Sequence, residues 1–475
     1  MKTFTAEQKR LIGLKFVIEN ICPTSPYGIE RLKRLSVFSR SQIGELNCEL
    51  DNLKLVVDNY RKFQAEFEML AHLFSQSKYI LRSIKRCASL QLDEVELFEF
   101  KEFLLLCKKI ITQFNIINQE IKLNLSFADT TKPLEILDKD GSGIPTFYIE
   151  DTSSPELEAV RKQKRAIEKL IKQNLKTPSN MQELINLSVK EMQIENVIKA
   201  SLCQKLIPYL GDIEYNCNQI ARLDLLIAKA VFALKYPSSR PQIDCENLKV
   251  VDMTNPQISD LLQQRGQSFT PLAICIGSGV TVVTGANMGG KSVFIQTITL
   301  NVILAHLGCY VFAKKFETPF FDFFSFISCE QEQISKGLSG FGTEIVNLNF
   351  VYRQAKKEVG FIVFDEFARS TNAGEAQTIF SAVVKTFNQN SSFVLMTTHL
   401  DNVADEAKYH YQVIGLDKDK IKKMRLFDQE QGIEQIAGCM NYGLVKVDNI
   451  PLPKDAITIC KLLGLDSDIL SKIEP

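Results

Sequence analysis

The chain has 475 residues, enough for about two to four domains that each bury a hydrophobic core. Its hydrophobic fraction of 45% and charged fraction of 24% are ordinary for a soluble globular protein. Lys plus Arg and Asp plus Glu both total 56, so the formal net charge is zero, without the basic surplus usual in a dedicated nucleic-acid-binding protein.

Cysteine usage and the first residues indicate the compartment. The 12 cysteines are scattered with no CxxC spacing, and only 4 histidines accompany them, which favours buried free thiols in a reducing cytoplasm. The start, MKTFTAEQKR, has no apolar core like that of a signal peptide. No apolar run reaches the ~18 residues that a membrane span needs. We therefore expect a soluble, cytoplasmic protein with no membrane association.

The first half has the pattern of consecutive helices. Apolar residues recur at helical spacing, and turns interrupt them near Asp138–Pro145 and Thr177–Asn180. A short strand-like segment, Thr146–Ile149, follows the first turn. The expected helices cover residues 43–75, 94–124, 155–172 and several segments across 181–235. This pattern predicts an all-helical domain over residues 1–240.

The pattern changes near Tyr236–Pro241, where β-branched and aromatic runs begin to alternate with helices. Such alternation is typical of a predominantly parallel sheet with helices on both faces. The expected strands include residues 280–284, 361–364, 393–398, 411–416 and 424–428, and the tail, 455–473, is an expected helical segment. The predicted fold class is α + α/β, with the second domain over residues 241–475.

The clearest motif is a P-loop, or Walker A motif, after the expected strand at 280–284. It consists of Gly285, Ala286, Asn287, Met288, Gly289, Gly290, Lys291 and Ser292, and fits G-x-x-x-x-G-K-[ST] throughout. Glycines let backbone amides surround phosphate oxygens, and the helix N-terminus adds its positive dipole end. We expect Lys291 to bind the β- and γ-phosphates of ATP and Ser292 to ligate Mg²⁺. Val293 completes the predicted nucleotide-binding segment.

A second motif is the acidic pair that ends the expected strand at 361–364. Asp365 is predicted to hold the Mg²⁺ shell, and Glu366 to deprotonate the attacking water, a general-base role worth ~10²–10⁴ in rate. Apolar strands often end in acidic residues, so this pair is specific only in combination with the P-loop. Together the two motifs predict a Mg²⁺-dependent ATPase with Lys291 and Glu366 as catalytic residues.

Two further segments fit an ATPase of the ABC type. Leu338–Glu344 is a glycine-rich stretch before a helix, and Ser339 is predicted to bind the γ-phosphate of nucleotide held by a second subunit. The alternative is a merely flexible turn. His399, at a strand end, is predicted to sense the γ-phosphate and to belong to the catalytic set, the alternative being a structural histidine.

These motifs resemble those of the MutS superfamily of DNA mismatch repair ATPases. TGANMGGKS resembles the family's TGPNMGGKS, DEFARST its DEIGRGT, and TTHL its THY or THL. FGTEI falls where the family has F-x-x-E-M, and Asn441–Gly443 resembles its S-Y-G-I. The likeness is continuous from about residue 245 to the end. In the helical half, Thr24–Leu32, Asp151–Leu157 and Leu223–Lys229 are similar to landmarks of a branch without mismatch-reading domains.

The resemblance implies a helical lever domain linked to an ATPase that forms a homodimer through its C-terminal helices. The chain departs from the full family pattern: we expect no mismatch-reading domain, no full clamp between Lys172 and Ile194, and no nuclease domain. Ala286, Val293 and Gly340 replace the family's usual proline, threonine and threonine. These changes spare the residues predicted for hydrolysis, whereas DNA binding stays open.

Two functions remain open from the sequence. The first is a role in DNA metabolism, repair or recombination, on branched or duplex DNA. The second is a protein-remodelling ATPase, similar to the ATPase subunit of a reactivase for the adenosylcobalamin-dependent lysine aminomutase. A protein client would explain the short clamp region and the zero net charge, and family resemblance favours DNA. A purely structural role fits an intact Lys291 and Glu366 poorly.

Overall fold

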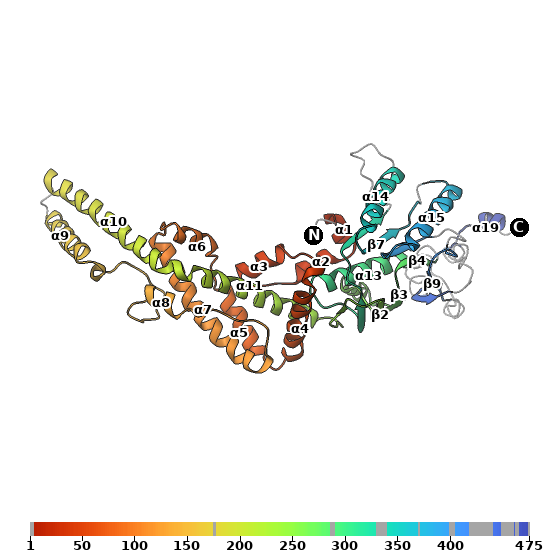
Figure 1. Cartoon of the computed structure of the whole chain (residues 1–475), viewed down its shortest axis with the longest axis horizontal. Coiled ribbons are helices and arrows are strands. Elements are labelled where there is room, and N and C mark those ends of the chain that lie inside the picture. The colour runs from red at the N-terminus through yellow and green to blue at the C-terminus, as the bar shows by residue number, and fades with distance from the viewer. Residues whose placement is uncertain are drawn as a thin grey trace. The chain divides into compact units, whose positions relative to one another are not determined.

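The computed structural model describes residues 4–173, 177–285, 290–328, 340–368, 371–398, 404–417, 440–447, 460 and 465–473. Contacts between Cα atoms divide the chain into two compact units. The helical unit contains Cys22–Arg34 and Leu55–Ala228, and the sheet unit contains Met1–Ile21, Leu35–Lys54 and Lys229–Pro475. The fold class is α + α/β, as predicted (Figure 1). The predicted domain boundary at residue 240 stays a prediction. The two compact units are made of segments that alternate along the chain.

The helical unit consists of helices and the turns between them. Its helices are α3 (Pro26–Lys33), α5 (Gln64–Ser75), α6 (Leu81–Ala88), α7 (Glu94–Ile121), α8 (Thr131–Leu137), α9 (Pro155–Lys172), α10 (Pro178–Leu206), the short η2 (Asp151–Ser153) and η3 (Ile207–Tyr209), and most of α11 (Leu210–Ala233). The predicted strand-like segment Thr146–Ile149 is wrong. It forms no strand because the described helical unit contains no other strand with which it could pair.

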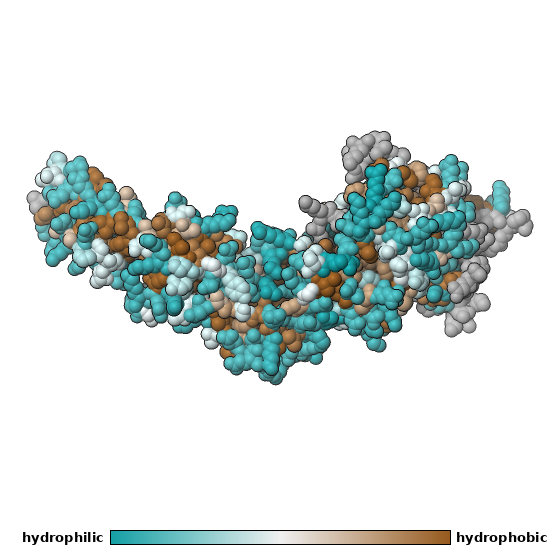
Figure 2. Space-filling view, in the orientation of Figure 1, coloured by the Kyte–Doolittle hydropathy of each residue, from teal (hydrophilic) through white to brown (hydrophobic). Residues whose placement is uncertain are grey.

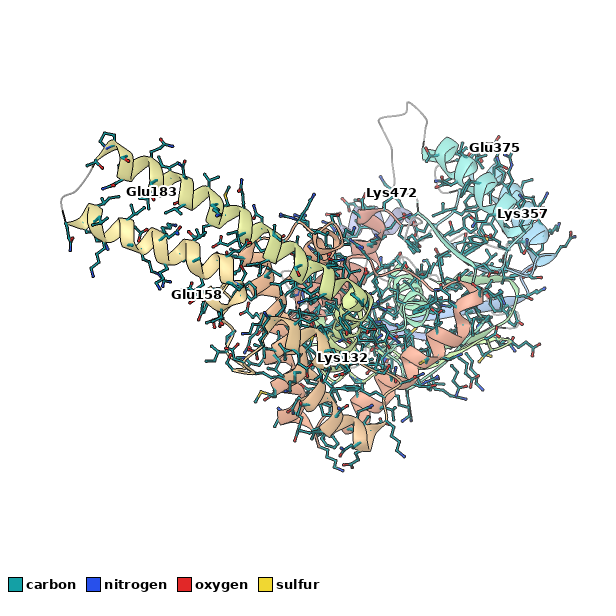
Figure 3. The ribbon with its side chains drawn as sticks, turned by 60° about the vertical axis from the view of Figure 1, so that its left-hand side comes forward. Lys132, Glu158, Glu183, Lys357, Glu375 and Lys472 are labelled. Carbon is teal, nitrogen blue, oxygen red and sulfur yellow. The ribbon has the colours of Figure 1, made fainter. Side chains whose placement is uncertain are left out.

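Helices α9 and α10 lie side by side (Figures 1 and 3). Ser154 caps α9 and Thr177 caps α10, each by accepting a hydrogen bond from a backbone amide three residues ahead. At their base Arg161 of α9 donates to Asp151, Glu191 and Glu195 over 2.7–2.8 Å. Hydrophilic side chains cover much of the visible face of this pair (Figure 2).

A buried carboxylate fixes the start of α3. Asp224 of α11 accepts hydrogen bonds from the amides of Thr24 and Ser25 and from the Ser25 hydroxyl, the last at 2.6 Å. Burial raises the pKa of Asp224, and these hydrogen bonds oppose that rise by stabilising the charged form. A Cβ atom on Gly28 would lie 2.3 Å from the carboxylate, so this close approach requires glycine. Two segments of the family resemblance therefore meet at Asp224.

The sheet unit contains two sheets. The six-stranded sheet has the order β10-β9-β4-β8-β7-β6, all parallel except β10, which pairs antiparallel with β9. Its strands are β4 (Gly279–Thr284), β6 (Phe323–Ser328), β7 (Gly360–Asp365), β8 (Phe393–Thr397), β9 (Tyr409–Leu416) and β10 (Met440–Lys446). The four-stranded sheet has the order β1-β5-β2-β3, from β1 (Gln242–Ile243), β2 (Leu248–Met253), β3 (Leu272–Ile276) and β5 (Lys315–Thr318).

Helices flank the six-stranded sheet (Figure 1). The unit contains α1 (Ala6–Leu11), α2 (Leu14–Asn20), η1 (Arg40–Gln42), α4 (Ile43–Asn59, ending in the helical unit), α12 (Pro256–Gln264), α13 (Lys291–His306), α14 (Gly340–Ala355), α15 (Ala373–Asn388) and α19 (Ser467–Ile473). The predicted strand at 424–428 lies outside the described residues, as does most of the predicted helical tail. No helix among the described residues is long and apolar enough to cross a membrane.

Helix α13 is buried in the core of the sheet unit. From Phe294 to His306 all but one of its residues are buried, so this helix is enclosed by protein around its circumference. His306 ends the helix among Phe320, Phe321 and Phe324. Its Nδ1–H donates to the Val302 carbonyl at 2.8 Å, and its Nε2 accepts from the Phe321 amide at 3.0 Å. Burial lowers the pKa of His306 from 6.5 to about 4, so the neutral ring is the native form.

We predict that His306 makes the stability of the protein sensitive to acid. Because its folded pKa lies below its unfolded value, its stabilising contribution is complete above pH 6.5 and is lost as the pH falls towards 4. The shift corresponds to about 3 kcal/mol. His306→Phe should be less stable than wild type at pH 7.5 in urea unfolding, and this difference should shrink as the pH falls from 6.5 to 4. A difference that stays constant over this range would contradict the assignment.

Candidate functional site

Three neighbouring parallel strands bring the chemistry-bearing segments to one edge of the sheet. Strand β8 lies between β4 and β7 and pairs with both, Val283 of β4 opposite Thr397 and Phe364 of β7 opposite Met396. Because all three strands run in the same direction, their carboxyl ends lie at the same edge. The segment after β4, the acidic pair after β7 and the end of β8 therefore meet there.

Two glycines of the predicted P-loop have positive φ angles. Gly285 has φ 145° and Gly290 has φ 90°, both in the region that favours glycine. A Cβ atom on Gly290 would lie 2.7 Å from the ring of Tyr442 on β10, so the aromatic ring packs directly on the backbone here. Gly290 is also the N-cap of α13, which begins at Lys291. Residues Ala286, Asn287, Met288 and Gly289 lie outside the described residues.

The Lys291 side chain contacts the first residue of the predicted P-loop. Its side chain is buried, and its Nζ donates to the Gly285 carbonyl at 2.6 Å. Burial lowers the pKa of Lys291, whereas the negative charges of Glu366 and Asp365 raise it. The ammonium group and the acidic pair are thus close enough to interact electrostatically. This cation stands at the N-terminal end of a helix, an arrangement that favours a bound phosphate.

The acidic pair lies in a tightly held turn, Asp365–Ala368, which we call the acidic turn. Thr397 Oγ1 donates to Asp365 Oδ1 at 2.8 Å and accepts from the Glu366 amide at 2.9 Å. Glu366 and Ala368 both have positive φ, 53° and 62°, which costs free energy for residues other than glycine. The Ala368 amide donates to Glu344 Oε2 of α14 at 3.0 Å. Side chains from β8 and α14 therefore hold the turn.

Of the site residues predicted from the sequence, the structure brings together Gly285, Gly290, Lys291, Asp365 and Glu366. Ser292 and Val293 follow in the first turn of α13 and are partly buried. Ser339 and His399 lie outside the described residues, so their roles stay predictions. Thr397 and Glu344, which contact the acidic turn, were not among the predicted site residues, although both lie within motifs quoted for the resemblance.

The donor set fits a hard divalent cation. Ser292 offers a hydroxyl and Asp365 a carboxylate, the oxygen ligands that Mg²⁺ uses together with water and phosphate oxygens. Among the described residues no group of three or more His, Cys, Asp or Glu side chains could hold a metal ion without such help.

Comparison with known proteins agrees with this arrangement. Residues 281–463 match the family model described as MutS domain V. The DNA mismatch repair protein MutS of Bacillus subtilis is 25% identical over 295 residues, which cover 59% of this chain and 32% of that protein. MutS of Thermus thermophilus is 23% identical over 352 residues, or 70% of this chain and 41% of that protein.

The fold is thus α + α/β, with the segment after β4, the acidic turn and the end of β8 at one edge of the six-stranded sheet. These matches support membership of the MutS family, as the sequence motifs predict. The matched part of the chain spans 32% and 41% of the length of these two relatives.

Proposed function

We propose that the chain binds ATP with Mg²⁺ at the edge formed by β4, β8 and β7, and hydrolyses it. The observation that carries this proposal is the buried Lys291, held at the start of α13 beside the acidic turn. Lys291 and the N-terminal end of α13 present positive charge at the same place, an arrangement that favours a bound phosphate. A polyphosphate would place its negative charge beside both of them.

Each residue of the site has a defined task in this proposal. The P-loop amides, Gly285 to Ser292, bind the phosphate oxygens, and Lys291 neutralises charge on the β- and γ-phosphates. Ser292 and Asp365 would hold Mg²⁺, which supplies electrostatic stabilisation of the transferring phosphoryl group when bound. Glu366 orients the attacking water and accepts its proton. His399 is proposed to contact the γ-phosphate from the end of β8.

Nucleotide binding is proposed to occur in a homodimer. The P-loop and the acidic turn of one copy would contact only one side of a bound nucleotide. Ser339, just before α14, would approach the γ-phosphate of the nucleotide held by a second copy. The Glu344–Ala368 contact supports this proposal because it ties α14 directly to the turn that carries Glu366. Nucleotide binding at one copy would then change the position of the hydrolytic residues of the other copy. The lever helices would transmit this conformational change.

The two relatives, both named DNA mismatch repair proteins, favour a role in DNA metabolism for this chain. Its zero net charge argues against strong binding to duplex DNA in general, because phosphate contacts need basic residues. We propose that it acts on DNA in repair or recombination. The protein-client alternative, a reactivase for a cobalamin-dependent aminomutase, gains no support from these matches.

Two substitutions separate nucleotide binding from hydrolysis. Lys291→Ala should abolish ATP binding because the phosphates lose a charge that the backbone amides cannot supply. Glu366→Gln should still bind ATP with Mg²⁺ but hydrolyse it about 10²–10⁴-fold more slowly, since an amide cannot accept the proton. Equilibrium binding of a fluorescent ATP analogue and release of inorganic phosphate measure the two steps. Wild-type turnover by Glu366→Gln would refute the assignment of the base.

The shared site is tested by mixing two inactive proteins. Ser339→Arg should block the contact with the partner's nucleotide, and Lys291→Ala should prevent binding in its own loop, so each homodimer should be inactive. A heterodimer of the two has one intact site, and phosphate release should partly return. If the mixture stays inactive while size measurements show heterodimers, the shared-site mechanism is wrong.

For DNA we predict weak, salt-sensitive affinity for linear duplex and no preference for mismatches. Each basic contact that is absent from the interface makes the slope of log affinity against log salt concentration shallower by about one. Fluorescent homoduplex, mismatched and four-way DNA titrated at two salt concentrations provide the measurement. Tight, mismatch-selective binding at physiological salt would overturn this prediction.

A further inference from the structure

Thr397, the last residue of β8, contacts both acidic residues of the site with one hydroxyl group. The hydroxyl donates its only hydrogen to Asp365 Oδ1 at 2.8 Å and accepts the Glu366 N–H at 2.9 Å. The Thr397 side chain is fully buried. It is the first residue of the TTHL segment quoted for the resemblance, and only His399 of that segment has a predicted task.

The first contact fixes the direction of a carboxylate. Asp365 ends β7, and contacts of its side chain decide which rotamer it adopts. A hydrogen bond to an ionised carboxylate in a partly buried position is stronger than one between neutral groups. The hydroxyl of Thr397 therefore restricts the orientation of the Asp365 carboxylate.

The second contact holds a strained backbone. Glu366 has φ 53°, the left-handed conformation that side-chain-bearing residues adopt only when their surroundings enforce it. Its amide points to Thr397 Oγ1, which is rigid because β8 pairs with β4 and β7 on both sides. This bond fixes where the chain leaves β7, and hence the direction in which the Glu366 side chain departs.

We propose that Thr397 is a positioning residue, whose hydroxyl keeps the metal-binding Asp365 and the general base Glu366 in one fixed relation. The inference rests on the proposed function, because it assigns these roles to the two acidic residues. Valine has the same shape as threonine but can neither donate nor accept. Serine keeps the hydroxyl and loses only a methyl group.

The test compares Thr397→Val with Thr397→Ser. Thr397→Val should raise the Mg²⁺ concentration needed for half-maximal ATP hydrolysis and lower kcat by about tenfold to a hundredfold, the effect of one lost hydrogen bond to a charged group. The KM for ATP at saturating Mg²⁺ should change less, because Lys291 and the P-loop are untouched. Thr397→Ser should recover most of the activity.

A matched control is available in the neighbouring strand. Thr281 of β4 is also fully buried and lies opposite Leu395 of β8, and its hydroxyl has no hydrogen-bond partner among the described residues. Thr281→Val should leave the Mg²⁺ requirement and kcat unchanged. Thermal unfolding of all three variants shows whether each retains the wild-type fold.

The outcomes separate this inference from the proposed function. Thr397→Val with wild-type kcat and Mg²⁺ requirement would overturn it, as would Thr397→Ser that is as impaired as Thr397→Val, since packing alone would then explain the loss. If wild type does not hydrolyse ATP, the proposed function fails. Binding of Mg²⁺ to the ATP-loaded protein then decides about Thr397: an unchanged Mg²⁺ affinity in Thr397→Val refutes its role, and a weakened affinity recovered by Thr397→Ser supports it.

Discussion

Parallel pairing of β8 with β4 on one side and β7 on the other determines where every described residue of the site lies. Main-chain hydrogen bonds fix the register of three strands, so Thr284, Asp365 and Thr397 end at a common edge. A shift by one residue would turn the inward side chains outward and separate Thr397 from Asp365. The sheet therefore sets the geometry of the acidic turn before any ligand binds.

Helices on both faces keep this sheet rigid. Alternate residues of β4, β7 and β8 pack against α14 and α15, as Val282, Phe364 and Met396 do. Residues of the opposite set, such as Phe361 and Phe393, contact Phe321, which stacks on His306 at the end of α13. The same helix that presents Lys291 at its start is thus anchored in the core at its end, as a preorganised binding site requires.

Local patterns made much of this predictable from sequence. The P-loop spacing placed Lys291 at a helix start, and apolar runs placed strands within one or two residues of β4, β7 and β8. Contacts between segments were not predictable, because Thr397 meets Asp365 only through the strand order β4-β8-β7, which no local pattern encodes. Glu344 likewise reaches Ala368 across the fold. The prediction of a strand-like segment at Thr146–Ile149 was wrong for the same reason, because a strand needs a neighbouring strand to pair with.

The most direct test of the central claim follows the fate of bound ATP. Protein loaded with radiolabelled ATP in the presence of EDTA is freed of excess nucleotide and then given Mg²⁺, and bound ATP and ADP are measured over time. Because Lys291 and the P-loop amides bind the phosphates while hydrolysis needs the metal held by Asp365, ATP should persist until Mg²⁺ is added and then become ADP and phosphate. Bound ATP that stays intact after Mg²⁺ addition, or a protein that retains no ATP with or without Mg²⁺, would contradict the account.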